Sequence, residues 1–172
     1  MTLSTNKIRS YTAYYEMYDN MNDWNYLGQH NVDFKNTDIL MSPALVGMAS
    51  VTFRPFVGTL ESLKSAYATL NGKYVGKQYY DNTSSDERCI PAYFVADLAI
   101  GYEIPLRRRS SNQNESSSLA FSFHVHNLFN QKYYADAWLW SAYFQHDNQY
   151  YSEVGLYPQA PANCMFKVSW KF

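Results

Sequence analysis

Apolar and polar residues alternate along the last ten residues of the chain, NCMFKVSWKF, from position 163 to position 172. The apolar parity consists of Phe166, Val168, Trp170 and Phe172, and the other parity is mostly polar. Successive side chains of a β-strand point to opposite faces, so the pattern predicts a strand with one bulky apolar face and one hydrophilic face. Such an apolar face fits either a protein core or the acyl chains of a membrane.

The same alternation occurs in three other stretches, 44–54, 92–104 and 118–129. Their apolar parities are Leu45, Gly47, Ala49, Val51 and Phe53; Phe94, Ala96, Leu98, Ile100, Tyr102 and Ile104; and Leu119, Phe121, Phe123 and Val125. In the second stretch, Asp97 and Glu103 share the polar parity. Unpaired burial of a carboxylate is costly, so these groups need water, a cation or an ion pair. That requirement favours a hydrated interior over a dry core.

Two further strands are predicted at 2–16 and within 59–80, the latter from about Ala66 although ESLKSAYATL also has helical propensity. We expect the strand at 118 to continue to about Trp138 and the final strand to follow Pro161. Long polar loops are predicted at 17–37, 81–91 and 139–160, a turn at 54–58 and a polar connection at 105–117. The fold class predicted is all-β: an antiparallel meander of about six long strands without a helix. Strands of this length can cross a bilayer.

Aromatic residues make up 18% of the chain, with 17 Tyr and 4 Trp. Such enrichment is typical of the boundary between an apolar band and water, and also of some carbohydrate-binding β domains. The net charge of −1 and the lack of a basic patch argue against nucleic acid as a partner. No apolar run reaches the length of a transmembrane helix, which leaves a membrane barrel open. The N-terminal MTLSTNKIRS lacks the apolar core of a signal peptide, so for an exported protein we expect the signal to have been lost or to lie upstream.

Few residues in the sequence are candidates for a disulfide, a metal site or catalysis. Cys89 and Cys164 could form a disulfide or be unrelated small residues, and neither lies in a CxxC motif. His124 and His126 share a strand face and could bind one metal, with His146 as the nearest further ligand, or could be ordinary lumen-facing polar residues. Asp97 and Glu103, about 20 Å apart along a strand, cannot form a catalytic pair. We therefore expect no enzyme, no catalytic residue, no metal and no cofactor.

The region after position 137 is rich in aromatic residues that could stack on a sugar, a haem or a catecholate. The candidate ligand-binding residues are Trp138, Trp140, Tyr143 and Tyr150, with Phe144 and Tyr151 beside them. Aromatic girdles at a membrane surface use the same residue types, so both readings stay open.

Three segments carry a resemblance to a known family: KYVGKQYYDNT at 73–83, NLFNQKYYADAW at 127–138 and YPQAPANCMFKVSWKF at 157–172. In this order they resemble the C-terminal part of TonB-dependent outer-membrane receptors, more closely over 73–172 than over 1–72. The resemblance implies a segment of a 22-stranded barrel with a plugged lumen, which imports siderophores, cobalamin, glycans or similar solutes. Residues 1–172 would form the C-terminal portion of that barrel, with the plug domain and the N-terminal strands absent and Met1 as an internal start.

The resemblance also implies a Gram-negative outer-membrane location and several partners. These are outer-membrane lipid, the TonB system through the missing plug, an unidentified solute, and the barrel-assembly machinery. The last would read Trp170 and Phe172 as a C-terminal signal, although both residues also fit a simple final strand. The alternative function is a soluble secreted β domain that binds carbohydrate through its aromatic loops, and detergent dependence would separate the two.

Overall fold

A computed structural model describes residues 1–54, 65–106 and 117–172. The described residues form β-strands, turns and connections, without a helix. The chain divides into two compact units. Unit 1 comprises Met1–Val46, Val75–Tyr93 and Lys132–Gln159, and unit 2 comprises Gly47–Tyr74, Phe94–Gln131 and Ala160–Phe172. No helix among the described residues is long and apolar enough to cross a membrane.

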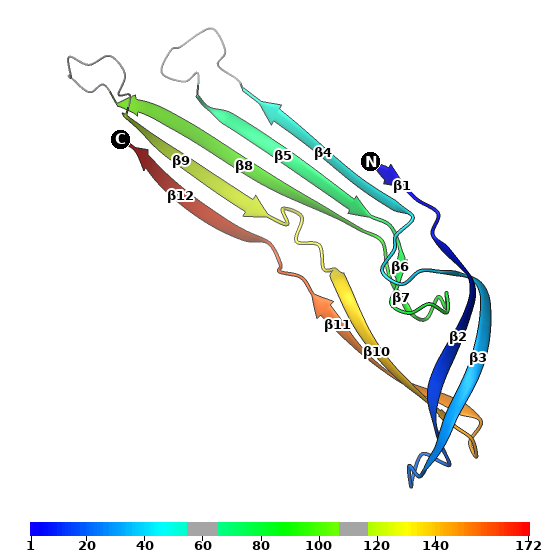
Figure 1. Cartoon of the computed structure of the whole chain (residues 1–172). Coiled ribbons are helices and arrows are strands. Elements are labelled where there is room, and N and C mark those ends of the chain that lie inside the picture. The colour runs from blue at the N-terminus through cyan, green and yellow to red at the C-terminus, as the bar shows by residue number, and fades with distance from the viewer. Residues whose placement is uncertain (55–64, 107–116) are drawn as a thin grey trace. The chain divides into compact units, whose positions relative to one another are not determined.

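Unit 2 is built on one sheet, in which the strands lie side by side in a single layer (Figure 1). Its strands are β4 (Leu45–Phe53), β5 (Tyr67–Val75), β8 (Tyr93–Leu106), β9 (Ser117–His126) and β12 (Asn163–Lys171). They are neighbours in that order. The short β1 (Thr2–Leu3) pairs antiparallel with Leu45 and Val46, the first two residues of β4, and these two residues belong to unit 1. The order follows the chain, as the predicted meander requires.

The strand register of unit 2 aligns apolar residues with apolar residues on one face. Three rows across β8, β9 and β12 show this: Ile100–Phe123–Phe166, Tyr102–Phe121–Val168 and Ile104–Leu119–Trp170. We call this side of the sheet the apolar face. The opposite side, the polar face, carries rows such as Gly101–Ser122–Lys167 and Glu103–Ala120–Ser169. A shift of one residue in any pair would mix the two sets, so the alternation fixes the register.

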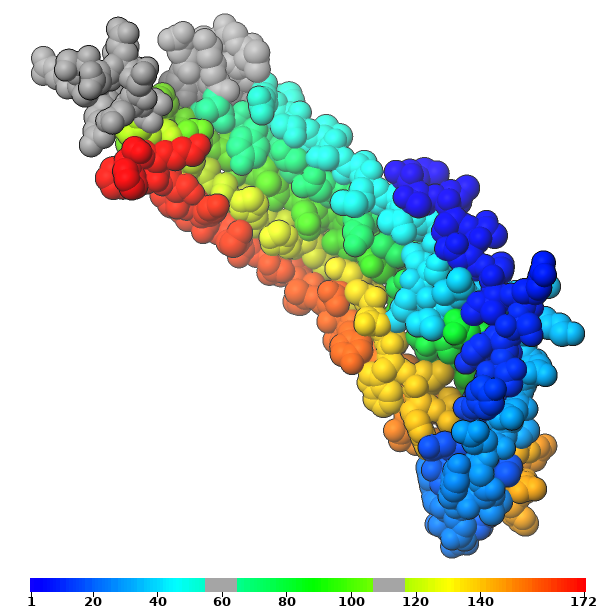
Figure 2. All heavy atoms as spheres, viewed as in Figure 1, coloured from blue at the N-terminus to red at the C-terminus, as the bar shows by residue number. Residues whose placement is uncertain are grey.

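The apolar face is open to solvent in the structure. Val51, Phe166 and Trp170 expose 67%, 63% and 66% of their surface. Among the apolar side chains that are buried in the described part of the chain, only Ala96 belongs to unit 2. Burial of one large apolar side chain is worth about 1.5–3 kcal/mol, so a face of eight or more half-exposed residues forgoes on the order of 10 kcal/mol in water. In Figure 2, β12 and β9 of this sheet lie directly at the molecular surface. A contiguous apolar surface of this kind marks a contact with lipid or protein.

Asn127 closes the turn that follows β9. Its backbone adopts a left-handed φ of 51° and its side chain is buried. Asn127 Nδ2 donates to the carbonyl oxygens of Gln131 (2.9 Å) and Ala160 (3.1 Å), while its Oδ1 accepts from the Gln131 amide (2.9 Å). Asn tolerates the left-handed region and can satisfy three backbone groups at once. The NLFN segment is therefore a turn that ties residues 127–131 to residue 160, just before β12.

Apart from β1 and the ends of strands of the large sheet, the described part of unit 1 is built from three hairpins. The long ones pair β2 (Lys7–Tyr18) with β3 (Tyr26–Asp38), and β10 (Tyr134–Phe144) with β11 (Gln149–Pro158). The short one pairs β6 (Gln78–Tyr79) with β7 (Cys89–Ile90). β2 and β10 also pair in parallel, but over three residue pairs only, from Glu16–Ala142 to Tyr18–Phe144. Ala142 and Phe144, which take part in this contact, are fully buried.

The structure confirms the predicted strands at 45–53, 93–106, 117–126 and 163–171, and the strand rather than helix from Tyr67 onward. The loop predicted at 17–37 is wrong, because it contains β3, and the loop at 139–160 is wrong, because it contains most of β10 and all of β11. The loop at 81–91 ends in β7, and the strand expected to continue through 127–138 is interrupted by the Asn127 turn. The turn predicted at 54–58 and the connection at 105–117 lie mostly outside the described residues.

These errors have a common physical cause. Most of the surface of the unit 1 hairpins is exposed to solvent. Asn, Gln and His therefore occupy strand positions, and the sequence lacks a clean apolar alternation there. Their Tyr, Trp, Phe and Val residues still have high β propensity, because such side chains pack well on a pleated surface. The parallel contact between β2 and β10 is a second departure from the predicted antiparallel meander.

Candidate functional site

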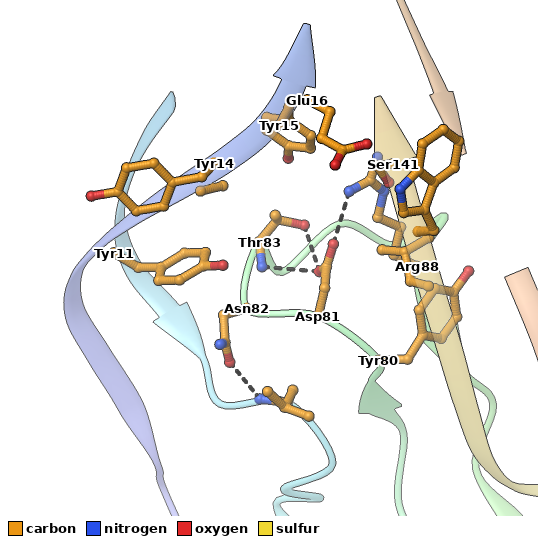
Figure 3. Close-up of a pocket in the computed structure, with 14 residues that line it drawn as sticks. Tyr11, Tyr14, Tyr15, Glu16, Tyr80, Asp81, Asn82, Thr83, Arg88 and Ser141 are labelled. Atoms are coloured by element: carbon orange, nitrogen blue, oxygen red, sulfur yellow. Dashed lines mark hydrogen bonds and ion pairs between the residues drawn. The ribbon is translucent and has the colours of Figure 1, made fainter. Parts of the chain in front are cut away.

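A cavity of about 400 Å³ lies in unit 1, where the short ladder between β2 and β10 ends. Most of its lining comes from three segments, β2, β10 and the connection between β6 and β7 (Figure 3), and Leu40, which follows β3, completes it. We call it the Arg88 cavity. Its lining residues are Tyr11, Ala13, Tyr14, Tyr15, Glu16, Leu40, Tyr80, Asp81, Asn82, Thr83, Arg88, Leu139, Trp140 and Ser141.

The connection between β6 and β7 is held in place by its own side chains. Asp81 Oδ1 accepts hydrogen bonds from the amide (3.0 Å) and the hydroxyl (2.7 Å) of Thr83, the geometry of an Asx turn. Asn82 Oδ1 accepts from the amide of Leu40 (2.8 Å). Ser84 Oγ accepts from the Asp38 amide at 2.6 Å and donates to the Asp38 carboxylate at 3.1 Å. These bonds fix the segment against the end of β3, so its polar groups reach the cavity in a defined arrangement.

Arg88 is the cation of the cavity. Its Nη1 lies 2.9 Å from Asp81 Oδ2, and its Nη2 donates to Ser152 Oγ on β11 at 3.0 Å. Both side chains of the ion pair are largely buried, at 17% and 15% exposure. Charge-assisted hydrogen bonds in such surroundings are stronger than those at an open surface. The pair therefore forms a rigid polar wall that joins the β6–β7 connection to the β10–β11 hairpin.

The side chains that line the Arg88 cavity carry a small net negative charge. Two carboxylates, Glu16 and Asp81, line it together with the single guanidinium of Arg88. Burial is the main cause that raises the pKa of Tyr11 and of Tyr80 above 10, so both hydroxyls are neutral at physiological pH. The tyrosines consequently contribute O–H groups and ring faces, and no charge.

Of the four ligand candidates from the sequence, Trp140 lines the Arg88 cavity. Its indole stacks on that of Trp24, with ring centroids 6.1 Å apart and an interplanar angle of 11°. Trp138 serves another purpose, since its indole occupies the space above Gly155, where an added Cβ would overlap it. Covering a strand glycine with an aromatic ring is a known stabilising arrangement in sheets.

Tyr143 and Tyr150 belong to a ring cluster beside the cavity. Tyr143 stacks on His30, with centroids 4.1 Å apart, and Tyr150 contacts both Tyr143 and Tyr15 at 5.1 Å. The hydroxyl of Tyr150 lies 3.1 Å from His30 Nε2. Because Tyr15 also lines the Arg88 cavity, this cluster supports its wall rather than presenting free ring faces.

Among the remaining candidates from the sequence, Cys89, Phe144, His146 and Tyr151 lie in unit 1, and the others lie in unit 2. Trp170 and Phe172 are exposed and their rings touch edge to face, 5.7 Å apart. His124 Nε2 lies 3.0 Å from Ser122 Oγ, whereas His126 Nδ1 lies 3.6 Å from Asp97 Oδ2. The described residues include no group of three His, Cys, Asp or Glu that could hold a metal.

The acidic residues of the polar face have partners, as the sequence reading required. Asp97 Oδ1 accepts from the Asn127 amide at 2.9 Å, and Glu103 Oε1 lies 3.9 Å from Lys171 Nζ. Cys89 and Cys164 are free thiols, so the structure shows no disulfide between them.

Sequence reasoning missed the polar half of the Arg88 cavity, namely Asp81, Asn82 and Arg88. They lie in a stretch interpreted only as a loop. An available signal was the Asp81-x-Thr83 spacing, which is typical of a fixed Asx turn rather than a free connection. Nothing in the sequence shows that β2 and β10, more than a hundred residues apart, supply the other walls.

Comparison with known proteins adds no relative: the chain matches no protein-family model, no curated protein sequence and no solved structure.

Proposed function

We propose that this chain forms part of the wall of a TonB-dependent outer-membrane transport receptor in a Gram-negative cell. In this proposal the sheet of unit 2 faces lipid with its apolar face and a hydrated lumen with its polar face. The hairpins of unit 1 form the extracellular, solute-binding part. The resemblance of residues 73–83, 127–138 and 157–172 to this family motivates the proposal, and the two-faced sheet supports it.

The observation that carries the proposal is the open apolar face of unit 2. A soluble domain of this size buries its apolar parity in a core, yet here Phe166, Val168 and Trp170 of β12 are all more than half exposed. The register keeps this property across neighbouring strands. Lipid acyl chains would cover such a face without a second protein layer.

The polar face supports the same assignment. It carries Glu103, Lys167 and Lys171, and the first and last of these lie within ion-pair distance. A cavity on this side is lined by these three residues with Arg54, Ser65 and Ser169 among others. Charged groups of both signs fit a wet lumen and the surface of a plug.

The proposal also assigns partners. Trp170 and Phe172 would be read by the barrel-assembly machinery, and the TonB system would act through a plug domain outside this chain. No residue is assigned a catalytic role, and no cofactor is required.

Detergent dependence is the test. We expect the purified chain to need detergent or lipid micelles to stay monodisperse, and to fractionate with outer membranes after expression behind a signal peptide. A chain that is monomeric, cooperative in unfolding and soluble without detergent would refute the proposal and favour the secreted carbohydrate-binding domain.

A pair of lysine substitutions sharpens the test. Val168→Lys places a charge on the apolar face and should lower the free energy of unfolding in lipid by as much as about 2–4 kcal/mol. Ser169→Lys, on the polar face of the same strand, is the matched control and should change it by less than about 0.5 kcal/mol. Equal effects of the two substitutions would contradict a lipid-facing sheet.

A further inference from the structure

We propose that the Arg88 cavity binds a neutral, polyhydroxylated ligand, a sugar unit of one or two rings. The inference rests on the proposed function for its role in uptake and names the class of solute that the hairpins of unit 1 would select. It does not depend on the membrane assignment for the binding itself, because every residue used below lies in unit 1.

Charge excludes the anionic solutes. Recognition of a phosphate, a carboxylate or a catecholate complex calls for cations whose charge is not already compensated. The only cation that lines the described cavity, Arg88, is paired with Asp81 at 2.9 Å, and Glu16 adds a second carboxylate. An anion would therefore meet two carboxylates and one neutralised guanidinium. A neutral ligand meets no such penalty.

The hydrogen-bonding groups that line the Arg88 cavity suit the hydroxyl groups of a sugar, because each hydroxyl both donates and accepts a hydrogen bond. A guanidinium has five N–H donors, and Asp81, Ser152 and Tyr15 engage three of them, which leaves two for a ligand. Asn82 uses its oxygen to accept from the Leu40 amide, so its NH2 group is the part left to donate to a ligand. Asp81 supplies carboxylate lone pairs, and the neutral hydroxyl of Tyr11 can act in either sense. Mixed donors and acceptors on fixed elements suit a sugar rather than a purely accepting or purely donating group.

Aromatic rings supply the complementary apolar surface. Tyr11 lines the cavity from β2, with its ring directed toward Asp81 and Thr83 (Figure 3), and Trp140 lines it from β10. A sugar ring has one face of C–H groups that packs on an aromatic ring while its hydroxyls point outward. The volume of about 400 Å³ falls at the lower end of the range of small-ligand pockets. That size admits one or two sugar rings and excludes a whole haem.

The test is binding of the full chain, folded in detergent micelles, to an array of immobilised glycans. The array carries neutral di- to tetrasaccharides and the same glycans capped with sialic acid or sulfate. We expect retention of a subset of the neutral glycans over their capped forms. Arg88→Gln should weaken that binding at least about tenfold, the loss that follows removal of charge-assisted hydrogen bonds. Arg9→Gln, an exposed arginine on β2 outside the cavity, is the matched control and should leave it unchanged.

A second variant guards against misfolding of Arg88→Gln. Asn82→Asp keeps an oxygen for the Leu40 amide but removes the NH2 donors, so it should fold and still lose at least about tenfold in affinity. Trp140→Ala should lose affinity as well, whereas Trp138→Ala, two residues away and outside the cavity, should retain it. Far-ultraviolet circular dichroism of each variant verifies the strand content.

The inference is overturned if the folded chain retains no neutral glycan, if it prefers the capped forms, or if Asn82→Asp binds as the parent does. These outcomes are distinct from failure of the proposed function. A detergent-requiring chain that retains no neutral glycan overturns the inference alone. A chain that is soluble without detergent and retains neutral glycans overturns the receptor assignment alone.

Discussion

Replacement of Asn127 by alanine tests the turn that ties the end of β9 to the residue just before β12. The side chain makes three hydrogen bonds to backbone groups, two as donor and one as acceptor, and it is 4% exposed. Each such bond contributes a net of about 0.5–1.5 kcal/mol, and alanine is also disfavoured at the φ of 51°. We therefore expect Asn127→Ala to lower the free energy of unfolding by about 2–4 kcal/mol.

Urea unfolding of the chain in lipid vesicles, followed by tryptophan fluorescence, measures this loss. With a typical dependence of about 1–3 kcal/mol per molar urea, the midpoint should fall by about 1 M or more. Asn127→Gly separates the two causes, because glycine accepts the left-handed backbone while the side-chain bonds are lost. Compared with Asn127→Ala, the glycine variant should regain only the smaller part of the lost free energy of unfolding, the part caused by the left-handed backbone.

Asn163→Ala is the matched control, since that side chain is exposed and makes one local bond, to the Pro161 carbonyl oxygen at 3.0 Å. We expect a loss below about 1 kcal/mol. If Asn127→Ala and Asn163→Ala shift the midpoint equally, the turn does not stabilise the sheet and the reasoning fails.

Two further predictions concern an ion pair and a close contact. The Asp38 carboxylate is hydrogen-bonded to Lys7 at 2.6 Å, and this bond lowers the pKa of Asp38 below the ordinary 3.8. The stability that the ionised carboxylate contributes is therefore present above about pH 3.8 and is lost as the pH falls through the lower folded-state pKa. Asp38→Asn should remove that acid-dependent step from a near-ultraviolet circular dichroism titration, and an unchanged titration would contradict the assignment. Gly101→Ala should cost about 1–3 kcal/mol, because a Cβ there would overlap the ring of Tyr67. Combination with Tyr67→Ala in a double-mutant cycle should recover much of that loss, and strict additivity would refute the contact.

The sequence predicts unit 2 well because a single physical rule governs it. Side chains at alternate positions face alternate environments, so the parity of Phe121 and Phe123 is readable without any knowledge of their neighbours. The register then follows, since Phe166 and Val168 must share the face of the residues they pair with. Even the need of Asp97 and Glu103 for partners could be anticipated from the cost of burying charge.

Unit 1 is predictable only in part, because its strands follow no single rule. β3 has a period of two from Gln29 to Lys35, but His30 on the less exposed parity hides it in the sequence, and β10 mixes aromatic residues with Ser141 and shows no such period. The Arg88 cavity depends on the approach of β2, β10 and the β6–β7 connection, and no local pattern encodes such long-range contacts. Aromatic composition made both Trp138 and Trp140 ligand candidates, but it could not show that Trp140 lines the Arg88 cavity while Trp138 covers Gly155.

The central claim is that the apolar face of unit 2 lies against lipid and the polar face against water. Spin labels attached at single cysteines along positions 164–171, in a background without the native Cys89 and Cys164 thiols, test it directly in vesicles containing the folded chain. The account predicts that labels at even positions collide with lipid-dissolved oxygen and labels at odd positions with a water-soluble nickel complex, in strict alternation. The account would be contradicted if labels at the even positions collided with neither reagent, or if they collided with the nickel complex as readily as labels at the odd positions.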